Sequence, residues 1–376
     1  MEQYDVVVVG LGVMGAAATW SLTKRGARVL GVDANGAGHG LGSSHGKTRA
    51  TRESYFESPE YVPLMKEAHS LWRALAAEAG EDLLTMNGGA YFGPPDHLVL
   101  QGVVQAAAEH DLELDDLTPA EAMALHPGFF IPDDWQALIE RTSGVLRAEA
   151  CLVAFHDMAR RGGAELRFGE AMQSWRATDE GVIVDLASGP VRAKSLILTL
   201  GPWAVEGLAD ANLPIHGRRV TVAHFDTQRP ESYANDNLGV FFWSTPMGVY
   251  GGFQHIDGQG VKLLRHDDGG ACTPETIQRE VTDEDIRAFT DFSRIYLPDV
   301  GDKVLDAYTC IYTMTPDDHF IIDHHPASRN VVYATGFSGH GFKFAPVVGE
   351  ALADLTLNGA TDREIGFLRA DRFFRR

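Results

Sequence analysis

The sequence predicts an α/β protein in which a discontinuous first domain encloses a second, mainly antiparallel part of the chain. A complete strand–helix–strand unit occupies residues 4–33, and strands and helices alternate again in the middle and at the end of the chain. Residues 215–305 instead mix aromatic residues, β-branched residues and turn signals, which is typical of an antiparallel sheet. A length of 376 residues allows two domains at roughly 150 residues each. We expect the first domain to comprise residues 1–90, 145–214 and 322–376, and the second to comprise residues 91–144 and 215–321.

The opening unit is predicted from local signals. Tyr4–Val9 is a short β-branched run of the kind found in buried parallel strands. The Ala-rich stretch from Gly15 to about Arg25 favours a helix, and Gly26 favours its end. Val29–Asp33 returns as a second strand, which completes the unit.

Three later helices carry boundary signals of their own. Glu60–Ala79 has apolar residues at the spacing of an amphipathic helix, and Gly80 favours its end. Thr118 and Glu121 form a capping box for a short helix. Ala148–Arg161 is predicted as a helix closed by a pair of glycines.

The later α/β segments follow the same logic. The strands that we expect there are Ile183–Leu186, Ser195–Leu200 and Val331–Thr335. Pro346–Leu357 is predicted as a helix because a proline is favourable in the first turn, where its missing N–H is not needed.

Composition and charge exclude several classes of protein. The chain has 32 Lys and Arg against 52 Asp and Glu, a net charge of −20, which argues against nucleic-acid partners and against an anionic membrane surface. No apolar run approaches the ~18–20 residues of a membrane-spanning helix. The 3 cysteines cannot complete a disulfide framework, and the first residues show no export signal. We therefore expect a cytoplasmic protein.

A dinucleotide-binding fingerprint follows the first strand. It consists of Gly10, Gly12 and Gly15 in the sequence GLGVMG, with Asp33 at the end of the second strand. The glycines allow a tight turn, close approach of the backbone to a pyrophosphate and close helix–strand packing, and the acid can accept a hydrogen bond from a ribose. The fingerprint by itself leaves open whether the dinucleotide is NAD or FAD.

Two later segments favour FAD. Ser195–Trp203 is a buried strand that runs into a Gly-Pro break, and residues 336–341, GFSGHG, lie between a strand and a helix. The second arrangement directs another helix N-terminus, together with Gly341, at whatever lies over the sheet, and reduced flavin carries negative charge that such an end stabilises. A purely structural βα turn is the alternative.

A basic loop stands out in this acidic chain. Residues 42–52 contain Lys47, Arg49 and Arg52, beside His45 and Thr48. An Arg fork can hold a substrate carboxylate in two hydrogen bonds, and a second cation can polarise a flavin. A solvated basic loop is the alternative, although the preceding fingerprint favours the functional interpretation.

Other candidate residues have two interpretations each. Lys262 lies within an apolar strand, where it either faces inward as a cation beside the flavin or faces water on an edge strand. Cys310 is a lone cysteine, and such residues are more often buried small apolar side chains than reactive ones. The histidines do not have metal-ligand spacing, and residues 323–326, DHHP, favour a turn, so we expect no metal site.

Four stretches of the sequence are recognisable together. They are YDVVVVGLGVMG, GSSHGKTRATRESYFESPEYVPL, CIYTMTPDDHFIID and ATGFSGHGFKFAPVVGE. On these stretches, and over nearly its whole length, the chain resembles the monomeric sarcosine oxidase and N-methyltryptophan oxidase family of flavoenzymes. The resemblance implies a Rossmann-like FAD-binding domain with an inserted substrate domain.

The resemblance also implies roles for individual residues. Cys310 would hold the FAD through a thioether to the flavin 8α-methyl group, and Arg52 and Lys343 would clamp a substrate carboxylate. Lys262 would activate oxygen. Further residues expected at the site are Arg49 and His45 near the flavin ring, Thr48 beside the cofactor, and Tyr312, His266 and His340 along the pocket.

Departures from the family pattern concern the pocket wall. The family tends to have a tyrosine pair before Gly-Phe, whereas here Tyr250 is followed by Gly251, so one expected aromatic residue is missing. Phe242 adds an aromatic residue elsewhere, and we expect Tyr250 and Phe242 to contribute to the wall. These changes alter the shape of the pocket and put sarcosine itself in doubt as the substrate.

The predicted activity is oxidation of a secondary amine or amino acid, N-methylated or cyclic, by hydride transfer to FAD. The imine then hydrolyses and O2 is reduced to H2O2. The alternatives are an FAD amine dehydrogenase that passes electrons to a carrier, and a flavin-binding protein without catalysis. The resemblance implies a monomer, with a small amine and O2 as its partners.

Overall fold

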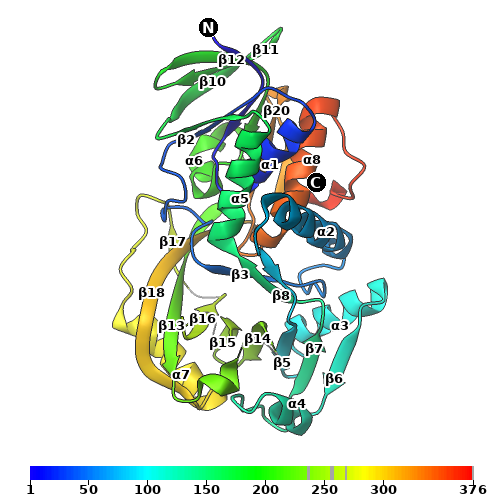
Figure 1. Cartoon of the computed structure of the whole chain (residues 1–376), viewed down its shortest axis with the longest axis vertical. Helices are drawn as coiled ribbons and strands as arrows, with labels where there is room; N and C mark the ends of the chain where they lie inside the picture. The colour runs from blue at the N-terminus through cyan, green and yellow to red at the C-terminus, as the bar shows by residue number, and fades with distance from the viewer. Residues whose placement is uncertain (235–237, 255–257, 267–268, 375–376) are drawn as a thin grey trace.

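Two large β-sheets, one toward each end of an elongated molecule, organise the fold (Figure 1). The structure is a computed structural model that describes residues 1–234, 238–254, 258–266 and 269–374. Within these residues the first sheet has eight strands in the order β10-β11-β12-β1-β2-β9, with β20 beside β12 and β19 beside β20. The second has nine strands in the order β17-β13-β16-β15-β14-β5-β7-β6, with β18 beside β13.

The first sheet contains the parallel strands expected from the opening βαβ unit. Its strands are β1 (Gln3–Val9), β2 (Val29–Asp33), β9 (Glu165–Phe168), β10 (Met172–Thr178), β11 (Gly181–Leu186), β12 (Gly189–Leu198), β19 (Ile321–His325) and β20 (Ser328–Thr335). β1 pairs in parallel with β2 and β12, β2 with β9, and β12 with β20, whereas the pairs β10–β11, β11–β12 and β19–β20 are antiparallel.

Four helices pack on the first sheet. They are α1 (Val13–Lys24), α2 (Tyr61–Ala79), α5 (Ala148–Arg161) and α8 (Ala345–Asn358). They share one hydrophobic core with β1, in which Val6 and Val8 contact the helices. Gly80 ends α2 at a left-handed φ of 72°, as predicted, because glycine adopts that conformation without steric strain.

The second sheet is mainly antiparallel. Its strands are β5 (Gly89–Gly93), β6 (Leu114–Leu117), β7 (Gln136–Glu140), β13 (His216–Thr227), β14 (Val240–Thr245), β15 (Gly248–Phe253), β16 (Val261–Arg265), β17 (Ala271–Cys272) and β18 (Val300–Met314). The helices beside it are α3 (Leu98–His110), α4 (Pro119–Leu125) and α7 (Asp283–Tyr296). A small sheet of β3 (Thr48–Thr51), β4 (Leu84–Thr85) and β8 (Gly144–Arg147) and the short helix α6 (Ala204–Gly207) complete these elements.

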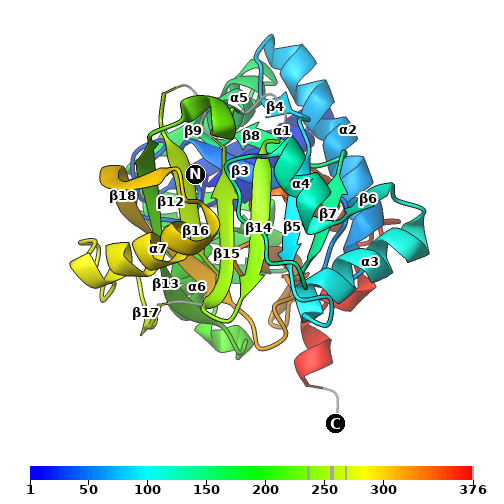
Figure 2. The ribbon, with the colours of Figure 1, turned by 90° about the horizontal axis from the view of Figure 1, so that it is seen from below.

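The two faces of the second sheet have different neighbours. α7 crosses the outer face, as the view from below shows (Figure 2). Phe289 and Phe292 of α7 pack there against Tyr250 and Leu263. Because side chains alternate along a strand, Lys262 points to the opposite, inner face.

One helix was not expected and one local expectation was wrong. Residues 215–305 were predicted to form an antiparallel sheet, which they do, but they also contain α7, whose start is marked by a capping box of Thr282 and Asp285. Residues 323–326 were predicted as a turn, but β19 continues to His325 because it pairs with β20, and the turn begins at Pro326.

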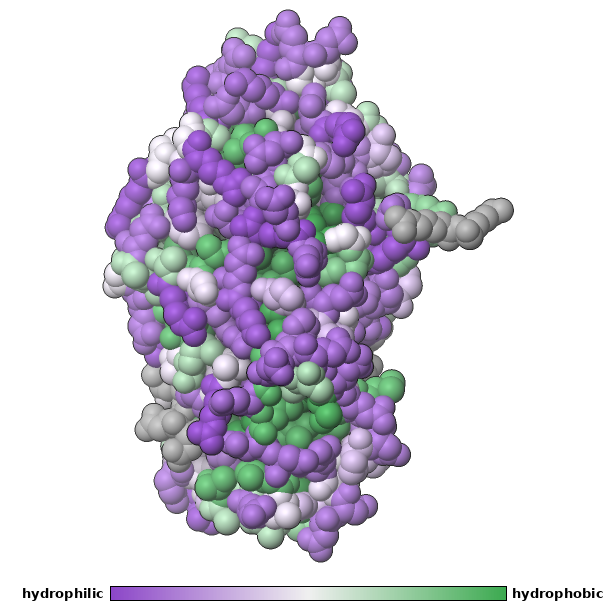
Figure 3. All heavy atoms as spheres, turned by 90° about the vertical axis from the view of Figure 1, so that its right-hand side faces the viewer, coloured by the Kyte–Doolittle hydropathy of each residue, from purple (hydrophilic) through white to green (hydrophobic). Residues whose placement is uncertain are grey.

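The described helices include none that is long and apolar enough to cross a membrane. The face of the molecule shown in Figure 3 is largely hydrophilic, with apolar patches mainly in its lower half.

Candidate active site

A cavity of about 860 Å³ lies between the two sheets. Its lining begins at the fingerprint turn after β1, passes the basic loop before β3, and ends at the inner face of β13, β16 and β18. The turn between β20 and α8 closes another side. Segments that are far apart in the sequence therefore meet around one space.

The fingerprint glycines are required for different reasons. Gly10 has a φ of +90°, and a Cβ there would lie 2.3 Å from the Thr199 carbonyl oxygen. A Cβ on Gly15 would lie 1.8 Å from the Gly10 carbonyl oxygen, so Gly15 allows α1 to pack on the turn. Gly12 lines the cavity, and a Cβ there would meet only Ser44 Oγ at 3.1 Å, so Gly12 leaves room for a ligand.

The first helix presents its N-terminus to the same space. Gly12 caps α1 without a side-chain hydrogen bond, and Val13 N donates to Ser44 Oγ at 3.0 Å. Asp33 lines the cavity, and its two carboxylate oxygens accept from Leu11 N and Asn35 N at 2.8 Å each. An open helix end and an oriented acid fit the pyrophosphate and ribose of a dinucleotide.

Lys262 is buried beside the basic loop, with only 4% of its surface exposed. Its Nζ donates to the Thr48 carbonyl oxygen at 3.0 Å and to Thr48 Oγ1 at 3.1 Å. Burial, and then the charge of Arg49, lower the pKa of Lys262 well below its usual value. The interpretation of Lys262 as an edge-strand residue that faces water is therefore wrong, because the inner face of β16 points into the cavity.

Arg49 is held by the backbone of its own loop. It donates hydrogen bonds to the carbonyl oxygens of Thr48 at 2.9 Å, Ser43 at 3.0 Å and His45 at 2.6 Å. His45 contacts the Gly42 and Thr309 carbonyl oxygens, and burial lowers its pKa, which favours the neutral ring. These bonds fix one cation at the cavity wall before any ligand binds.

Cys310 and Tyr308 face the cavity from β18. The Cys310 thiol is free, and burial raises its pKa. The Tyr308 hydroxyl is buried without a hydrogen-bond partner in the described part of the chain, and its ring lies 5.6 Å from that of His45. The hydroxyl lies against the basic loop, where a Cβ on Gly46 would come within 2.7 Å of it.

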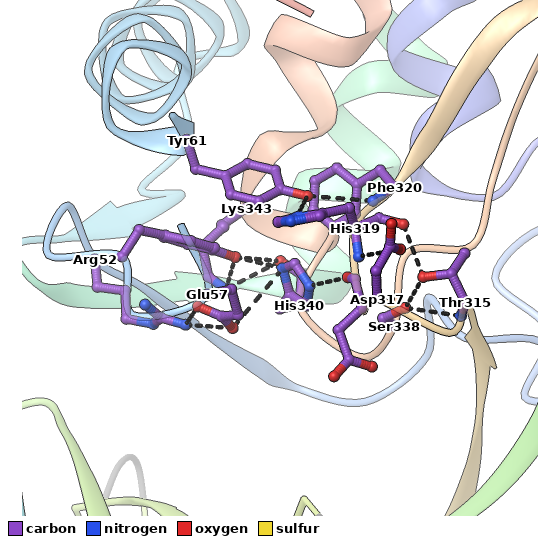
Figure 4. Close-up of polar contacts among 12 residues, drawn as sticks. Arg52, Glu57, Tyr61, Thr315, Asp317, His319, Phe320, Ser338, His340 and Lys343 are labelled. Atoms are coloured by element: carbon purple, nitrogen blue, oxygen red, sulfur yellow. Dashed lines mark hydrogen bonds and ion pairs between the residues drawn. The ribbon is translucent and has the colours of Figure 1, made fainter. Parts of the chain in front are cut away.

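Arg52 forms a buried ion pair with Glu57. Arg52 is 1% exposed, and one of its terminal nitrogens donates to both Glu57 oxygens at 2.8 and 2.7 Å. Although burial raises the pKa of Glu57, the charge of Arg52 lowers it, to about 2 overall. Figure 4 shows the Glu57 carboxylate between Arg52 and His340. Arg52 Nε is buried and has no hydrogen-bond partner among the described residues.

Lys343 and His340 complete this end of the cavity. Lys343 Nζ donates to the His340 carbonyl oxygen at 3.0 Å, and burial followed by the charge of Arg52 lowers the pKa of Lys343 well below its usual value. His340 Nε2 contacts the Asp318 carbonyl oxygen at 2.9 Å, so Nδ1 accepts from the Tyr55 hydroxyl at 2.6 Å. Burial lowers the pKa of His340 to about 3, which keeps the ring neutral.

Most of the predicted site residues line this one cavity. Those that do are Gly10, Gly12, Asp33, Arg49, Arg52, Phe242, Lys262, His266, Cys310, Tyr312, His340, Gly341 and Lys343. Gly15, His45 and Thr48 lie behind the wall and hold lining residues in place.

Tyr250 is the exception among the expected wall residues. Its ring stacks on Phe292 at 4.2 Å on the outer face of the second sheet, so it does not line the cavity. Gly251 occupies the inward position instead, and a Cβ there would lie 3.0 Å from His266 Nε2. The His266 ring therefore occupies the inner side of the sheet at this point.

Sequence reasoning missed Glu57, Tyr308 and Arg218. Glu57 lies five residues after Arg52, and that spacing alone does not indicate a pair because the intervening loop could direct the carboxylate anywhere. Tyr308 lies two residues from Cys310 on β18, and Arg218 lies two residues from Val220 on the paired strand β13, so each shares a strand face with that residue. This spacing could have indicated that both side chains face the same way as Cys310 and Val220.

The chain was compared with known proteins. The model of a family described as FAD dependent oxidoreductase matches residues 5–355. The chain is 40% identical over 368 residues to a monomeric sarcosine oxidase of Streptomyces avermitilis, with 96% of each chain covered. It is 33% identical over 376 residues to an N-methyl-L-tryptophan oxidase of Salmonella dublin, with 99% of each covered. Among solved structures, NikD, an amino acid oxidase of nikkomycin biosynthesis, matches with a TM-score of 0.87 at 23% identity, covering 98% of each chain.

Proposed function

The chain belongs to the FAD dependent oxidoreductase family, and on that premise we propose that it is an oxidase of secondary amines that releases H2O2. Relatives at 40% and 33% identity over almost the whole chain are a sarcosine oxidase and an N-methyltryptophan oxidase. FAD, when bound, supplies the two-electron acceptor that takes hydride from the substrate and delivers the electrons to O2.

One observation carries the proposal. The cavity that joins the fingerprint turn to the second sheet has cations on its walls at two separate places, Lys262 beside Arg49 and Lys343 beside Arg52. Two separated positive regions fit a reaction with an anionic substrate group on one side and developing negative charge on reduced oxygen on the other.

Arg52 and Lys343 would bind a substrate carboxylate. Arg52 lines the cavity while its guanidinium holds Glu57, and Lys343 lines it from the turn before α8. The neutral His340 ring lies beside them without adding charge. Holding the carboxylate in this way would orient the amine nitrogen and its neighbouring C–H bond.

Lys262 would assist the reduction of O2. It is a buried cation at the cavity wall, and its hydrogen bonds to Thr48 fix its position. A fixed charge in a site that excludes water stabilises developing negative charge more strongly than a solvated one.

A screen for peroxide release tests the proposed activity. Secondary amines with and without a carboxylate would be supplied to the yellow enzyme, and anaerobic bleaching of the flavin would be followed separately. We expect both bleaching and H2O2 from carboxylate-bearing secondary amines. Bleaching without H2O2 would favour the dehydrogenase, and the absence of bleaching with any amine would remove the catalytic interpretation. Reaction of carboxylate-free amines alone would refute the roles of Arg52 and Lys343.

We propose a thioether between Cys310 and the flavin 8α-methyl group. The free Cys310 thiol lines the cavity, which supports the link. Forming the C–S bond removes two hydrogens in total from the thiol and the methyl group, and O2 accepts them as H2O2. Acid precipitation should leave the colour in the pellet of the wild type and of Cys272→Ser, but in the supernatant of Cys310→Ser. A colourless wild-type pellet would refute the link.

We also propose that the protein is a cytoplasmic monomer. The described cysteines are all free, which suits a reducing compartment, and the Streptomyces relative is named as monomeric. Light scattering should give a mass near 40.9 kDa, and a mass twice that value would refute the monomer. Fractionation of the source cells should place the protein with cytoplasmic markers.

A further inference from the structure

Two neighbouring arginines on β13 have opposite surroundings. Arg219 points to the outer face, where it donates to Asp285 at 2.7 and 2.8 Å and to the Gln278 carbonyl oxygen at 2.7 Å. Arg218 points to the inner face and lines the cavity. The guanidinium of Arg218 makes no hydrogen bond or ion pair with a described residue, so its donors remain available in a partly buried position.

Arg218 differs in this respect from the other cationic residues of the cavity wall. Arg49 and Lys262 are held by the Thr48 carbonyl oxygen, Arg52 by Glu57 and Lys343 by the His340 carbonyl oxygen. Within the described part of the chain, Arg218 is therefore the one Lys or Arg of the lining whose charged group has no protein partner. The planar guanidinium offers a fork of N–H donors that matches a carboxylate.

The position of Arg218 is at the substrate end of the cavity. β13 and β18 pair so that Arg218 lies opposite Tyr312. The Tyr312 ring lies 6.4 Å from the His266 ring, and a Cβ on Gly339 would lie 2.3 Å from it. Tyr312 thus connects Arg218 with the turn that carries His340.

One acidic side chain faces Arg218 without pairing with it. Asp318 lines the cavity, burial raises the pKa of its carboxyl group, and the charge of Arg218 lowers it. The two groups interact through space but form no ion pair, unlike Arg52 with Glu57. Space therefore remains at the guanidinium for an anionic group that is not part of the chain.

We propose that Arg218 forms a second anion-binding subsite and that the substrate is a secondary amine with two carboxylates, such as an N-methylated amino dicarboxylic acid. This inference rests on the proposed function, in which Arg52 and Lys343 bind the first carboxylate. The second carboxylate satisfies the donors of Arg218 that the protein leaves open.

Binding of simple acids to the holoenzyme tests the subsite without turnover. Acetate and glutarate would be titrated against the flavin absorbance spectrum, because a ligand beside the flavin perturbs it. We expect glutarate to bind the wild type at least tenfold more tightly than acetate. In Arg218→Met, the ratio of the glutarate affinity to the acetate affinity should fall to near one. A wild-type ratio near one, or an unchanged ratio in Arg218→Met, would overturn the subsite.

Two further variants make the result specific. Arg192→Met removes an exposed arginine of β12 and should leave the wild-type ratio intact, which controls for net charge. Arg218→Lys keeps the charge without the planar fork, so its ratio should fall between those of the wild type and Arg218→Met. It also keeps the subsite testable if Arg218→Met does not fold. A ratio in Arg218→Lys equal to that of the wild type would overturn the requirement for the guanidinium fork.

Substrate kinetics provide a second measurement. We expect the ratio of kcat/KM for N-methylaspartate to kcat/KM for N-methylglycine to fall at least tenfold in Arg218→Met, mainly through KM. An unchanged ratio would overturn the inference. If the wild type oxidises neither compound nor any other secondary amine, the proposed function fails, while the glutarate and acetate titration still decides whether Arg218 binds an anion.

Discussion

Replacing Lys262 by methionine should slow reoxidation of the reduced enzyme about a thousandfold and should also make the fold more stable. Methionine keeps most of the length of the side chain but removes the charge. Lys262 is 4% exposed and lies on the inner face of β16, so the substitution changes the cavity wall without exposing new surface.

The kinetic magnitude follows from electrostatics. A unit charge about 4 Å from developing negative charge contributes roughly 4 kcal/mol at an effective dielectric constant near 20. Each ~1.36 kcal/mol corresponds to a tenfold change in rate, so its loss slows the step by about three orders of magnitude.

The effect on stability has the opposite sign. Burial lowers the pKa of Lys262, so the folded protein disfavours the charged amine, and methionine removes that penalty. Two hydrogen bonds to Thr48 are lost, at about 1 kcal/mol each, but the Thr48 carbonyl oxygen keeps its bond from Arg49 at 2.9 Å. Because the penalty of a buried ion is several kcal/mol, we expect a net gain of about 1–3 kcal/mol.

The gain should depend on pH. A lysine with a lowered folded pKa destabilises the protein fully below that pKa, and the penalty fades as the pH rises toward the unfolded value of ~10.4. The advantage of Lys262→Met in the free energy of unfolding should therefore be largest in acid and should shrink as the pH rises through the lowered folded pKa toward ~10.4. Lys47→Met, at an exposed position of the basic loop, should change neither the reoxidation rate nor the free energy of unfolding.

The assay does not require a known substrate. The flavin would be reduced photochemically without oxygen and then mixed with oxygenated buffer in a stopped-flow instrument, while urea unfolding reports stability. Reoxidation of Lys262→Met within fivefold of the wild type would refute the role of the cation. A loss of stability by more than 1 kcal/mol would show that Lys262 is needed for the fold instead.

Three further outcomes are expected. The amine must be neutral to develop an imine, so kcat/KM should rise with pH through the amine pKa, and a rate independent of pH from ~6 to ~10 would contradict this. Glu57 has a pKa lowered from 4.5 to about 2, which contributes about 3 kcal/mol at neutral pH and is lost as the pH falls from 4.5 toward 2. Glu57→Gln should therefore lower the free energy of unfolding, measured with urea, by about 3 kcal/mol at pH 7 but by less at pH 3. An equal loss at both pH values would argue against the buried pair. Gly251→Tyr should lower kcat/KM at least tenfold more for N-methylated aromatic amino acids than for N-methylglycine, because a Cβ there would already lie 3.0 Å from His266 Nε2, so the new ring would displace His266 into the cavity; equal losses for both substrates would show a general defect.

The buried pair of Arg52 and Glu57 shows how a local motif acquires its meaning from the fold. The sequence identifies Arg52 as a cation in a basic loop, and the resemblance implies that it binds a carboxylate. In the structure an internal carboxylate already holds one nitrogen of Arg52, and only Nε is left without a described partner. In the proposed function, the substrate would meet a guanidinium that Glu57 has already oriented, which would lower the entropy lost on binding.

The sequence alone was sufficient for the parts of this protein that depend on neighbouring residues. The strand, the turn at Gly10 and the helix of the fingerprint are specified by β-branched residues, glycines and alanines within a short segment, and the structure has them where they were predicted. α5 has the predicted bounds Ala148–Arg161 for the same reason.

Tertiary structure alone decided which face of each strand meets the cavity. Lys262 and Tyr250 both belong to apolar strands, yet Lys262 points into the cavity, whereas Tyr250, which was expected in the pocket wall, packs on α7. A one-residue shift in a strand exchanges its two faces, so the outcome depends on what packs against the sheet and not on the strand itself. The partnership of Glu57 with Arg52 and the isolation of Arg218 arise in the same way, because only the folded chain determines which charges come within reach of each other.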